Sequence, residues 1–279
     1  MRVATVDGLV TLFYDGSKEL FNSQLEREWE NEFAEYGQID FGNWESWDLS
    51  NDCKQYLRER SSWEQIIVVE GVTMIPIFTF YNCANIQRVI LSNTVIRVQY
   101  YAFKCCKSLV YMKLSINLEQ IDDCAFEGCN LASVFLPPRC RFVGGWAFGH
   151  NHNLNIVSVA QDTEIGSGAF FRVKFLGKFP FHHSLYEWPQ YYEHYEEIHT
   201  WMKNINNHED YALHRACSSY QPLKEVIMSI IENKGIRAFK TENSIGITPS
   251  EYLKENPYTE VTEQDIIHDY LMKMMGEVV

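Results

Sequence analysis

The sequence has no run of apolar residues that approaches the roughly 20 needed for a membrane-spanning helix. Its first residues, MRVATVDGLVTLFYDG, also lack the continuous apolar stretch of about 7 to 15 residues that marks a secretory signal. Basic residues are scarce too, because Lys and Arg number 24 against 37 Asp and Glu, which gives a net charge of −13. These deficits argue against membrane insertion and against nucleic acid as a partner, and they predict a cytoplasmic protein.

Cysteine is sparse, with 8 in 279 residues. That is too few for a disulfide-stapled scaffold, so we expect reduced thiols. The motifs of metal and nucleotide sites are absent as well: the sequence has no Cys-x-x-Cys pair, no His-Glu-x-x-His, no Gly-rich phosphate loop and no nucleophile elbow. We therefore predict no catalytic residue, no cofactor and no metal. The alternative, an enzyme or ligand-processing protein with an unrecognised site in the N-terminal or C-terminal zone, stays open.

What the sequence does contain is an internal repeat of 22 to 23 residues. Its most regular feature is a phenylalanine, preceded by Ala in four of five units and followed three residues later by Cys in the first three. The phenylalanines are Phe80, Phe103, Phe126, Phe148 and Phe170, and the cysteines are Cys83, Cys106 and Cys129, with Asn151 in the fourth unit. An aliphatic residue stands five positions before each Phe: Ile75, Val98, Ile121, Val143 and Ile165. The repeat predicts stacked coils with the Phe side chains in one continuous core.

Within one unit, apolar and polar residues alternate from Leu109 to Leu114, which indicates a half-buried strand. A second short extended segment is expected from Leu118 to Ile121, and the Ala-Phe turn closes the coil. The recurring Cys is interpreted as a small buried residue of that turn and not as a metal ligand.

The unit LVYMKLSINLEQIDDCAFEGC resembles the BspA-like class of leucine-rich repeats, in its period, its Ala-Phe pair and its Cys. The resemblance implies an α/β repeat solenoid of about five coils over residues 63–171, with a parallel sheet on one face and a role in binding. Members of that class are often secreted surface antigens, whereas the start of this sequence predicts an intracellular setting.

The two flanks are expected to cap the open ends of the solenoid. Residues 1–62 contain the hairpin dipeptides Asp7-Gly8 and Asp15-Gly16, an acidic helix over 23–36 and a further helix from about residue 51 to 60, which together predict an α+β cap. Its tryptophans, Trp29, Trp44, Trp47 and Trp63, are interpreted mainly as core.

Residues 172–279 change to a helical pattern. The stretch DYALHRACSSYQPLKEVIMSIIENKG predicts two helices that end at Gly235, and Thr262 with Asp265 predicts the cap of a last helix over about 263–275. Leu213, His214 and Ala216, and later Gly246, Thr248 and Pro249, resemble parts of the ankyrin motif. The resemblance implies a degenerate ankyrin-like pair, in which His214 stabilises a turn.

The outward strand positions suggest where a protein partner would bind. They are Gln65, Ile67, Arg88, Ile90, Tyr111, Lys113, Ser133, Phe135, Ile156 and Ser158. An apolar stripe of Ile90, Tyr111, Phe135 and Ile156 beside Arg88 and Lys113 has the composition of an interface core with a basic rim. We therefore predict a scaffold for protein–protein interaction at these six residues. The alternative is that a flanking segment folds over the stripe and covers it.

Overall fold

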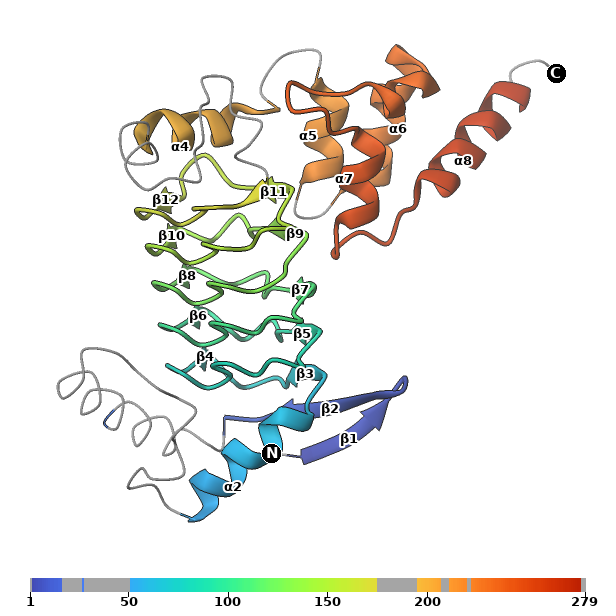
Figure 1. The fold of residues 1–279 in the computed structure, drawn as a ribbon. Coiled ribbons are helices and arrows are strands. Elements are labelled where there is room, and N and C mark those ends of the chain that lie inside the picture. The colour runs from blue at the N-terminus through green and yellow to red at the C-terminus, as the bar shows by residue number, and fades with distance from the viewer. Residues whose placement is uncertain are drawn as a thin grey trace.

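The computed structural model of the protein describes residues 2–16, 27, 51–174, 195–206, 211–219 and 222–276. Its centre is a stack of coils, each built from two short strands (Figure 1). The first strands are β3 (Gln65–Val68), β5 (Arg88–Ile90), β7 (Tyr111–Lys113), β9 (Ser133–Phe135) and β11 (Ile156–Ser158). The second strands are β4 (Met74–Ile75), β6 (Arg97–Val98), β8 (Gln120–Ile121), β10 (Phe142–Val143) and β12 (Glu164–Ile165). The expected repeat solenoid with parallel strands is confirmed.

Equivalent strands of successive coils pair in parallel, as the repeat predicts. The second strands form one sheet in the order β12-β10-β8-β6-β4. The first strands divide into two sheets, because β3, β5 and β7 pair with one another while β9 pairs only with β11. This division follows the unit that is one residue shorter than those before it, since Phe148 comes 22 residues after Phe126.

The five repeated phenylalanines form the centre of the core, and none exposes any surface. Neighbouring rings are stacked, with centroid distances of 4.9, 5.1, 5.3 and 5.4 Å from Phe80 to Phe170. A stacked array of this kind buries a large apolar area and adds ring–ring attraction to it. The expected burial of the Phe column is confirmed.

The turn around each Phe contains two residues with left-handed backbone, one two positions before the Phe and one two positions after it. Those before it are Phe78, Tyr101, Cys124, Trp146 and Gly168, and those after it are Asn82, Cys105, Gly128, His150 and Arg172. Left-handed backbone costs energy for any residue with a Cβ atom. The regular ladder of hydrogen bonds between turns, such as Phe103 N–H to the Ala125 carbonyl at 2.8 Å, offsets that cost in every coil.

The N-terminal segment extends the solenoid at its first coil. Strands β1 (Arg2–Val6) and β2 (Leu9–Tyr14) form the expected hairpin around Asp7 and Gly8, whose φ angles are 50° and 80°. Strand β2 then pairs in parallel with β3. Helix α2 (Asn51–Glu59) and the 3-10 turn η2 (Arg60–Ser62) lie beneath the coil, where Trp63 is fully buried with its ring 6.4 Å from that of Phe80. Apart from Arg27, the helix expected over 23–36 and residues 29, 44 and 47 lie outside the described residues.

The C-terminal part is helical, as expected. It contains α4 (Tyr195–Asn204), α5 (Ala212–Ser218), α6 (Lys224–Lys234), the 3-10 turn η5 (Ile236–Lys240), α7 (Pro249–Glu255) and α8 (Glu263–Gly276). Helix α4 lies across the last coil, where the Tyr195 hydroxyl donates to the Ile165 carbonyl at 2.5 Å. Helix α5 packs on α7, and α6 packs on α8. We call α5 to α8 the helical region. Its helix pairs are confirmed, whereas their assignment to the ankyrin class stays a prediction.

Candidate functional site

The outward face of β3, β5 and β7 is accessible over part of its surface, which we call the open half and define by Ile67, Arg88, Ile90, Tyr111 and Lys113. Arg88 and Lys113 are exposed, and the other three residues are half-buried. The strand register places Arg88 beside Tyr111 and Ile90 beside Lys113. The five side chains therefore form one continuous patch.

Arg88 and Tyr111 are in direct contact within the open half. The guanidinium carbon of Arg88 lies 4.8 Å from the centre of the Tyr111 ring. A cation at this distance is attracted by the negative face of the ring. Partial burial raises the pKa of the Tyr111 hydroxyl, and the positive charge of Arg88 opposes that rise. The hydroxyl is therefore a neutral hydrogen-bond donor and acceptor at physiological pH.

The other two residues of the predicted stripe are not accessible. Phe135 is 2% exposed and Ile156 is 5% exposed, so the expectation that they face solvent is wrong. The helical region lies against the outward face of their strands: the Ser133 hydroxyl donates to the Glu255 carbonyl at 3.4 Å, and the Ser158 hydroxyl donates to the Ser218 carbonyl at 2.8 Å. We call this the covered half. The alternative that a flank folds over the stripe therefore applies to β9 and β11, but not to β5 and β7.

Tyr258, which the sequence analysis did not single out, lies at the boundary between the two halves. Its hydroxyl accepts a hydrogen bond of 2.6 Å from the backbone N–H of Leu114, directly after β7. In the preceding coil, the equivalent N–H of Leu91 donates to the carbonyl of Lys113 on the next strand, at 2.9 Å. Tyr258 thus supplies the acceptor at the point where the sheet of first strands is divided.

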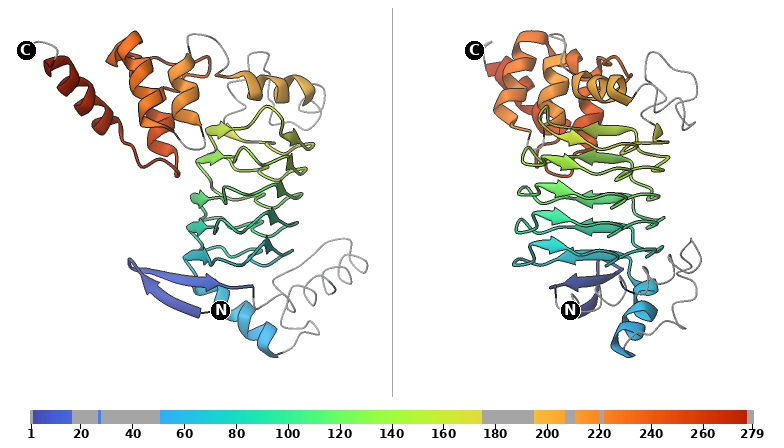
Figure 2. Two further views of the ribbon diagram at one scale, coloured as in Figure 1. Left: turned by 180° about the vertical axis from the view of Figure 1, so that it is seen from behind. Right: turned by 90° about the vertical axis from the view of Figure 1, so that its left-hand side faces the viewer.

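The open half lies on the side of the solenoid from which two other parts of the chain project. In Figures 1 and 2 the β1–β2 hairpin projects from one end of the solenoid and the helical region from the other, both on the side of β3, β5 and β7. We call the side of the solenoid between these two projections the bay, with the open half as its floor. Its floor carries Arg88 and Lys113, and one of its walls ends in the α7–α8 connection that contains Tyr258.

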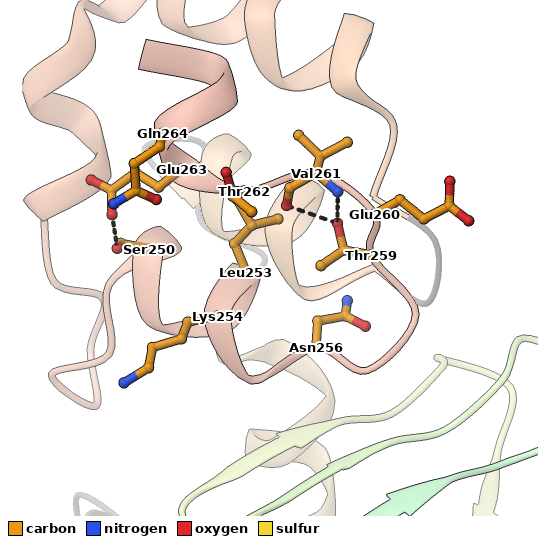
Figure 3. A pocket seen from close by; sticks show the side chains of 10 residues that line it. All are labelled: Ser250, Leu253, Lys254, Asn256, Thr259, Glu260, Val261, Thr262, Glu263 and Gln264. Carbon is orange, nitrogen blue, oxygen red and sulfur yellow. Dashed lines mark hydrogen bonds between the residues drawn. The ribbon is translucent and has the colours of Figure 1, made fainter. Parts of the chain in front are cut away.

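A separate cavity of about 380 Å³ lies between α7 and α8 (Figure 3). Its lining includes Ser250, whose hydroxyl is hydrogen-bonded to the Glu263 carboxylate, and Thr259, whose hydroxyl is bonded to the backbone of Val261. The Glu263 carboxylate also forms a 3.0 Å ion pair with Lys240. These groups bond to one another and hold the helices together, so we assign this cavity a structural role.

Three histidines that are buried or half-buried pack against aromatic rings. Burial lowers the pKa values of His150, His199 and His214, for His199 to about 4. Each ring lies against another aromatic ring, for example His199 at 4.1 Å from Tyr195. Among the described residues, no three His, Cys, Asp or Glu side chains are grouped closely enough to hold a metal ion. The described histidines are therefore not grouped into a metal site.

The repeated cysteines also donate hydrogen bonds between coils. The sequence analysis interpreted them only as small buried residues. The thiol of Cys106 donates to the Phe80 carbonyl at 3.1 Å, and that of Cys129 donates to the Phe103 carbonyl at 3.2 Å. Asn151 takes over in the fourth coil, and its amide donates to the Phe126 carbonyl at 2.8 Å. The sequence did contain a signal for this role, because Asn replaces Cys in the fourth unit. Cys and Asn both have a hydrogen-bond donor, whereas only Cys is apolar.

Comparison with known proteins identifies the repeat. Residues 73–199 match the family described as BspA type leucine rich repeat region, with 6 copies. No curated protein matches the sequence. None of the helices among the described residues has the length and apolar character needed to span a lipid bilayer.

Several solved structures of leucine-rich repeat proteins are similar to this chain. The leucine-rich repeat protein of T. pallidum is 26% identical, with a TM-score of 0.37, over 38% of this chain and 53% of that one. A leucine-rich repeat protein from Eubacterium ventriosum is 20% identical, with a TM-score of 0.39, over 42% of this chain and 31% of that one. One from Bacteroides ovatus is 24% identical, with a TM-score of 0.38, over 40% and 31%. The chain thus covers from about a third to about half of these proteins. Residues 73–199 therefore match a leucine-rich repeat region of the BspA type.

Proposed function

We propose that this protein is a non-enzymatic scaffold that binds a partner protein at the open half of its solenoid. The observation that carries the proposal is the contact between Arg88 and Tyr111 on an accessible sheet face, next to half-buried Ile67 and Ile90. Tyrosine and arginine contribute most of the energy in many protein interfaces, because they bring a large contact area and directional hydrogen bonds. Leucine-rich repeats commonly mediate protein–protein interaction, which agrees with this reading.

The geometry of the pair reduces the entropic cost of binding. A long Arg side chain loses much rotamer freedom when it is fixed in an interface. Here the Tyr111 ring already holds the Arg88 guanidinium at 4.8 Å, so part of that freedom is lost before a partner arrives. The planar guanidinium keeps several N–H donors for a carboxylate or a carbonyl of the partner.

The bay restricts which structural element of a partner can reach the open half. Its floor spans the outward face of three strands, β3, β5 and β7, between the hairpin and the helical region (Figure 1). We propose that a narrow element such as a helix or a loop enters this space and lays its apolar side on Ile67, Ile90 and Tyr111. Arg88 and Lys113 would then favour acidic groups at the edge of that element.

We also propose that the protein works in a reducing, intracellular setting. The buried thiols support this idea, because burial raises the pKa values of Cys140 and Cys217 to about 12, which keeps these groups protonated and unreactive. Cys106 and Cys129 moreover use their S–H groups as hydrogen-bond donors, which requires the reduced thiol.

The test replaces Tyr111 by a photo-crosslinking phenylalanine derivative in the native cell. A partner recovered in this way is then purified, and its affinity is measured against Arg88→Glu and Tyr111→Ala. We expect each substitution to weaken binding by about 1 to 4 kcal/mol, since both residues belong to the proposed interface core.

Arg141→Glu is the matched control, because Arg141 is an exposed arginine that precedes β10 on the other sheet. This charge reversal should leave affinity unchanged. Equal losses for Arg88→Glu and Arg141→Glu would refute a local site, as would a partner that binds both open-half variants with wild-type affinity.

A further inference from the structure

Strand β1 is the outer strand of the sheet that runs β1-β2-β3-β5-β7. It pairs with β2 on one side, and no strand of the described chain pairs with its other side. Four of its five residues, from Arg2 to Thr5, are exposed, and Val3 is 46% exposed. In Figures 1 and 2 the hairpin lies at the end of the solenoid, with β1 beyond β2.

The pairing of β2 establishes which backbone groups of β1 point outward. The carbonyls of Val10 and Tyr14 accept hydrogen bonds from Glu64 and Val69 at the β3 side, so the even-numbered residues of β2 direct their backbone groups toward β3. The odd-numbered residues Leu9, Thr11 and Phe13 therefore face β1, because backbone groups alternate along a strand.

Their partners in β1 are Val6, Ala4 and Arg2. The N–H and C=O groups of Val3 and Thr5 consequently point away from the sheet.

Other sheet edges of this protein are covered by specific contacts. The edge after β7 has the Tyr258 hydroxyl on the N–H of Leu114, and the last coil has the Tyr195 hydroxyl on the carbonyl of Ile165. Natural proteins otherwise protect an open edge with charge, proline or a bulge. Strand β1, with the sequence RVATV, contains one charged residue at its start and no proline. Its edge thus has the features of a pairing surface.

We propose that β1 pairs antiparallel with β1 of a second copy of this chain, in a register centred on Ala4. In that register Val3 lies opposite Thr5 of the second copy. Both residues then direct their free backbone groups at each other, which gives about four hydrogen bonds across the two-fold axis. The two sheets become one continuous sheet through the dimer.

The side chains of β1 are self-complementary in the same register. Ala4 faces Ala4 of the second copy in a pair without mutual hydrogen bonds, where Cα atoms approach to about 4.5 Å and small side chains fit best. Arg2 lies opposite Val6, so the two cations stay apart, and Arg2 already stacks at 4.5 Å on Phe13 of its own hairpin. A parallel pairing would instead align the two Arg2 residues, which is unfavourable. These features favour a second copy over an unrelated strand.

The expected dimer is weak and reversible. Pairing of two five-residue strands buries less than the roughly 1,000 Å² of a stable interface, so a dissociation constant of roughly 10 µM to 1 mM is expected. Each chain also carries a net charge of −13, and the resulting repulsion is reduced by salt. Association should therefore rise with ionic strength.

The experiment is sedimentation equilibrium of the full chain without an N-terminal tag, from about 10 µM to about 1 mM, a range chosen around the expected affinity. The wild type should shift from 32.7 kDa toward twice that mass. Thr5→Pro removes one outward N–H without touching the bonds to β2, and should reduce dimer formation at least about tenfold, since it removes two of the four hydrogen bonds across the axis. Thr5→Val keeps that N–H and should dimerise like the wild type. Circular dichroism melting confirms that each variant is folded.

A second variant and a residue-level measurement complete the test. Ala4→Lys places two cations at the centre of the pair and should abolish the dimer, whereas Ala4→Ser should retain it. Hydrogen exchange should show the Val3 and Thr5 amides gaining protection as concentration rises, with Ala4 and Val6 protected throughout. A monomer at all concentrations, a dimer that survives both Thr5→Pro and Ala4→Lys, or protection of Val3 and Thr5 only when another protein is added would overturn the proposal.

Discussion

The backbone N–H of Leu114 donates to the hydroxyl of Tyr258 at 2.6 Å, across 144 residues of sequence. This bond stands where the ladder between first strands is interrupted, since Leu91 in the coil before and Leu136 in the coil after donate to the neighbouring strands at 2.9 and 3.0 Å. The helical region is thereby joined to the backbone of the solenoid and not only to its side chains.

Tyr258→Phe should lower the free energy of unfolding by about 0.5 to 1.5 kcal/mol, because it removes the hydroxyl that accepts the Leu114 N–H. Urea denaturation measures the loss, and hydrogen exchange should show a faster Leu114 amide. Tyr270→Phe is the matched control, because the hydroxyl of Tyr270 has no hydrogen-bond partner within the described residues. An unchanged Leu114 amide in Tyr258→Phe would contradict this role.

Phe126→Ala should cost roughly 3 to 5 kcal/mol, because it leaves a cavity in the middle of the ring stack. Phe126 is fully buried, with Phe103 at 5.1 Å on one side and Phe148 at 5.3 Å on the other. Chemical denaturation gives the loss directly. Tyr111→Ala removes a half-buried aromatic ring from the outward face and should cost about 1 kcal/mol or less. Similar losses for the two variants would mean that the stack is not the main source of stability.

Replacement by alanine should destabilise the protein to different extents at Gly128 and Gly166. Gly128 has φ of +69°, so Gly128→Ala should cost about 1 kcal/mol through backbone strain. A Cβ atom at Gly166 would lie 2.5 Å from the Gly145 nitrogen and 2.7 Å from the Gly144 carbonyl carbon, which forces the turns apart. Gly166→Ala should therefore lower the melting temperature clearly more than Gly128→Ala. A larger loss for Gly128→Ala than for Gly166→Ala would show that the close contact between turns is not the main determinant of stability at these glycines.

Stability should fall as pH drops from about 6.5 to about 4. Burial lowers the pKa of His199 from 6.5 to about 4, so the unfolded chain binds a proton in this range that the folded chain does not. Acid therefore favours unfolding, and one pKa unit corresponds to about 1.4 kcal/mol, so His199 contributes up to about 3 kcal/mol. Denaturation midpoints measured against pH should show this slope. His199→Phe should flatten it, and an unchanged slope would assign the effect to other groups.

The thiols should react slowly in the folded protein and rapidly in denaturant. Burial raises the pKa values of Cys124, Cys140 and Cys217 to about 12, and alkylation requires the thiolate. All 8 cysteines should be labelled by iodoacetamide in guanidinium without a reductant. Native mass spectrometry should give the chain alone, without zinc. Bound zinc, or fewer than 8 labels, would show metal binding or disulfide bonds.

The sequence predicts the solenoid well because its information is local and repeated. The Phe period and the alternation in the strands depend on contacts within a coil or between adjacent coils. The cap at Thr262 is local as well, because it bonds to Asp265 three residues later. The left-handed turn positions were not predicted, because Tyr101, Cys124 and Trp146 stand where glycine would be the usual signal. The regular hydrogen bonds between turns, which no single unit reveals, hold these residues in that conformation.

The covering of Phe135 and Ile156 could not be read from strand alternation, because alternation is the same whether a face meets water or a helix. A compositional signal was nevertheless present. The outward positions of β5 and β7 include Arg88 and Lys113, whereas those of β9 and β11 hold only Ser, Phe and Ile. Loss of charge along the outward column thus marks where a distant part of the chain packs. Tyr258 itself had no such signal, because a single tyrosine between two helices has no periodicity.

Because Tyr258 attaches the helical region at a fixed coil, the number of coils sets the distance between the hairpin and the helical region. The hairpin is attached below β3 and the helical region above β7, and each coil between them adds one strand spacing, about 4.8 Å. Insertion of one repeat between these two attachment points would widen the bay by that step and rotate its walls by the twist of one strand pair, about 20°. A change in repeat number would therefore alter the size of the element that fits, while the five residues of the open half stay as they are.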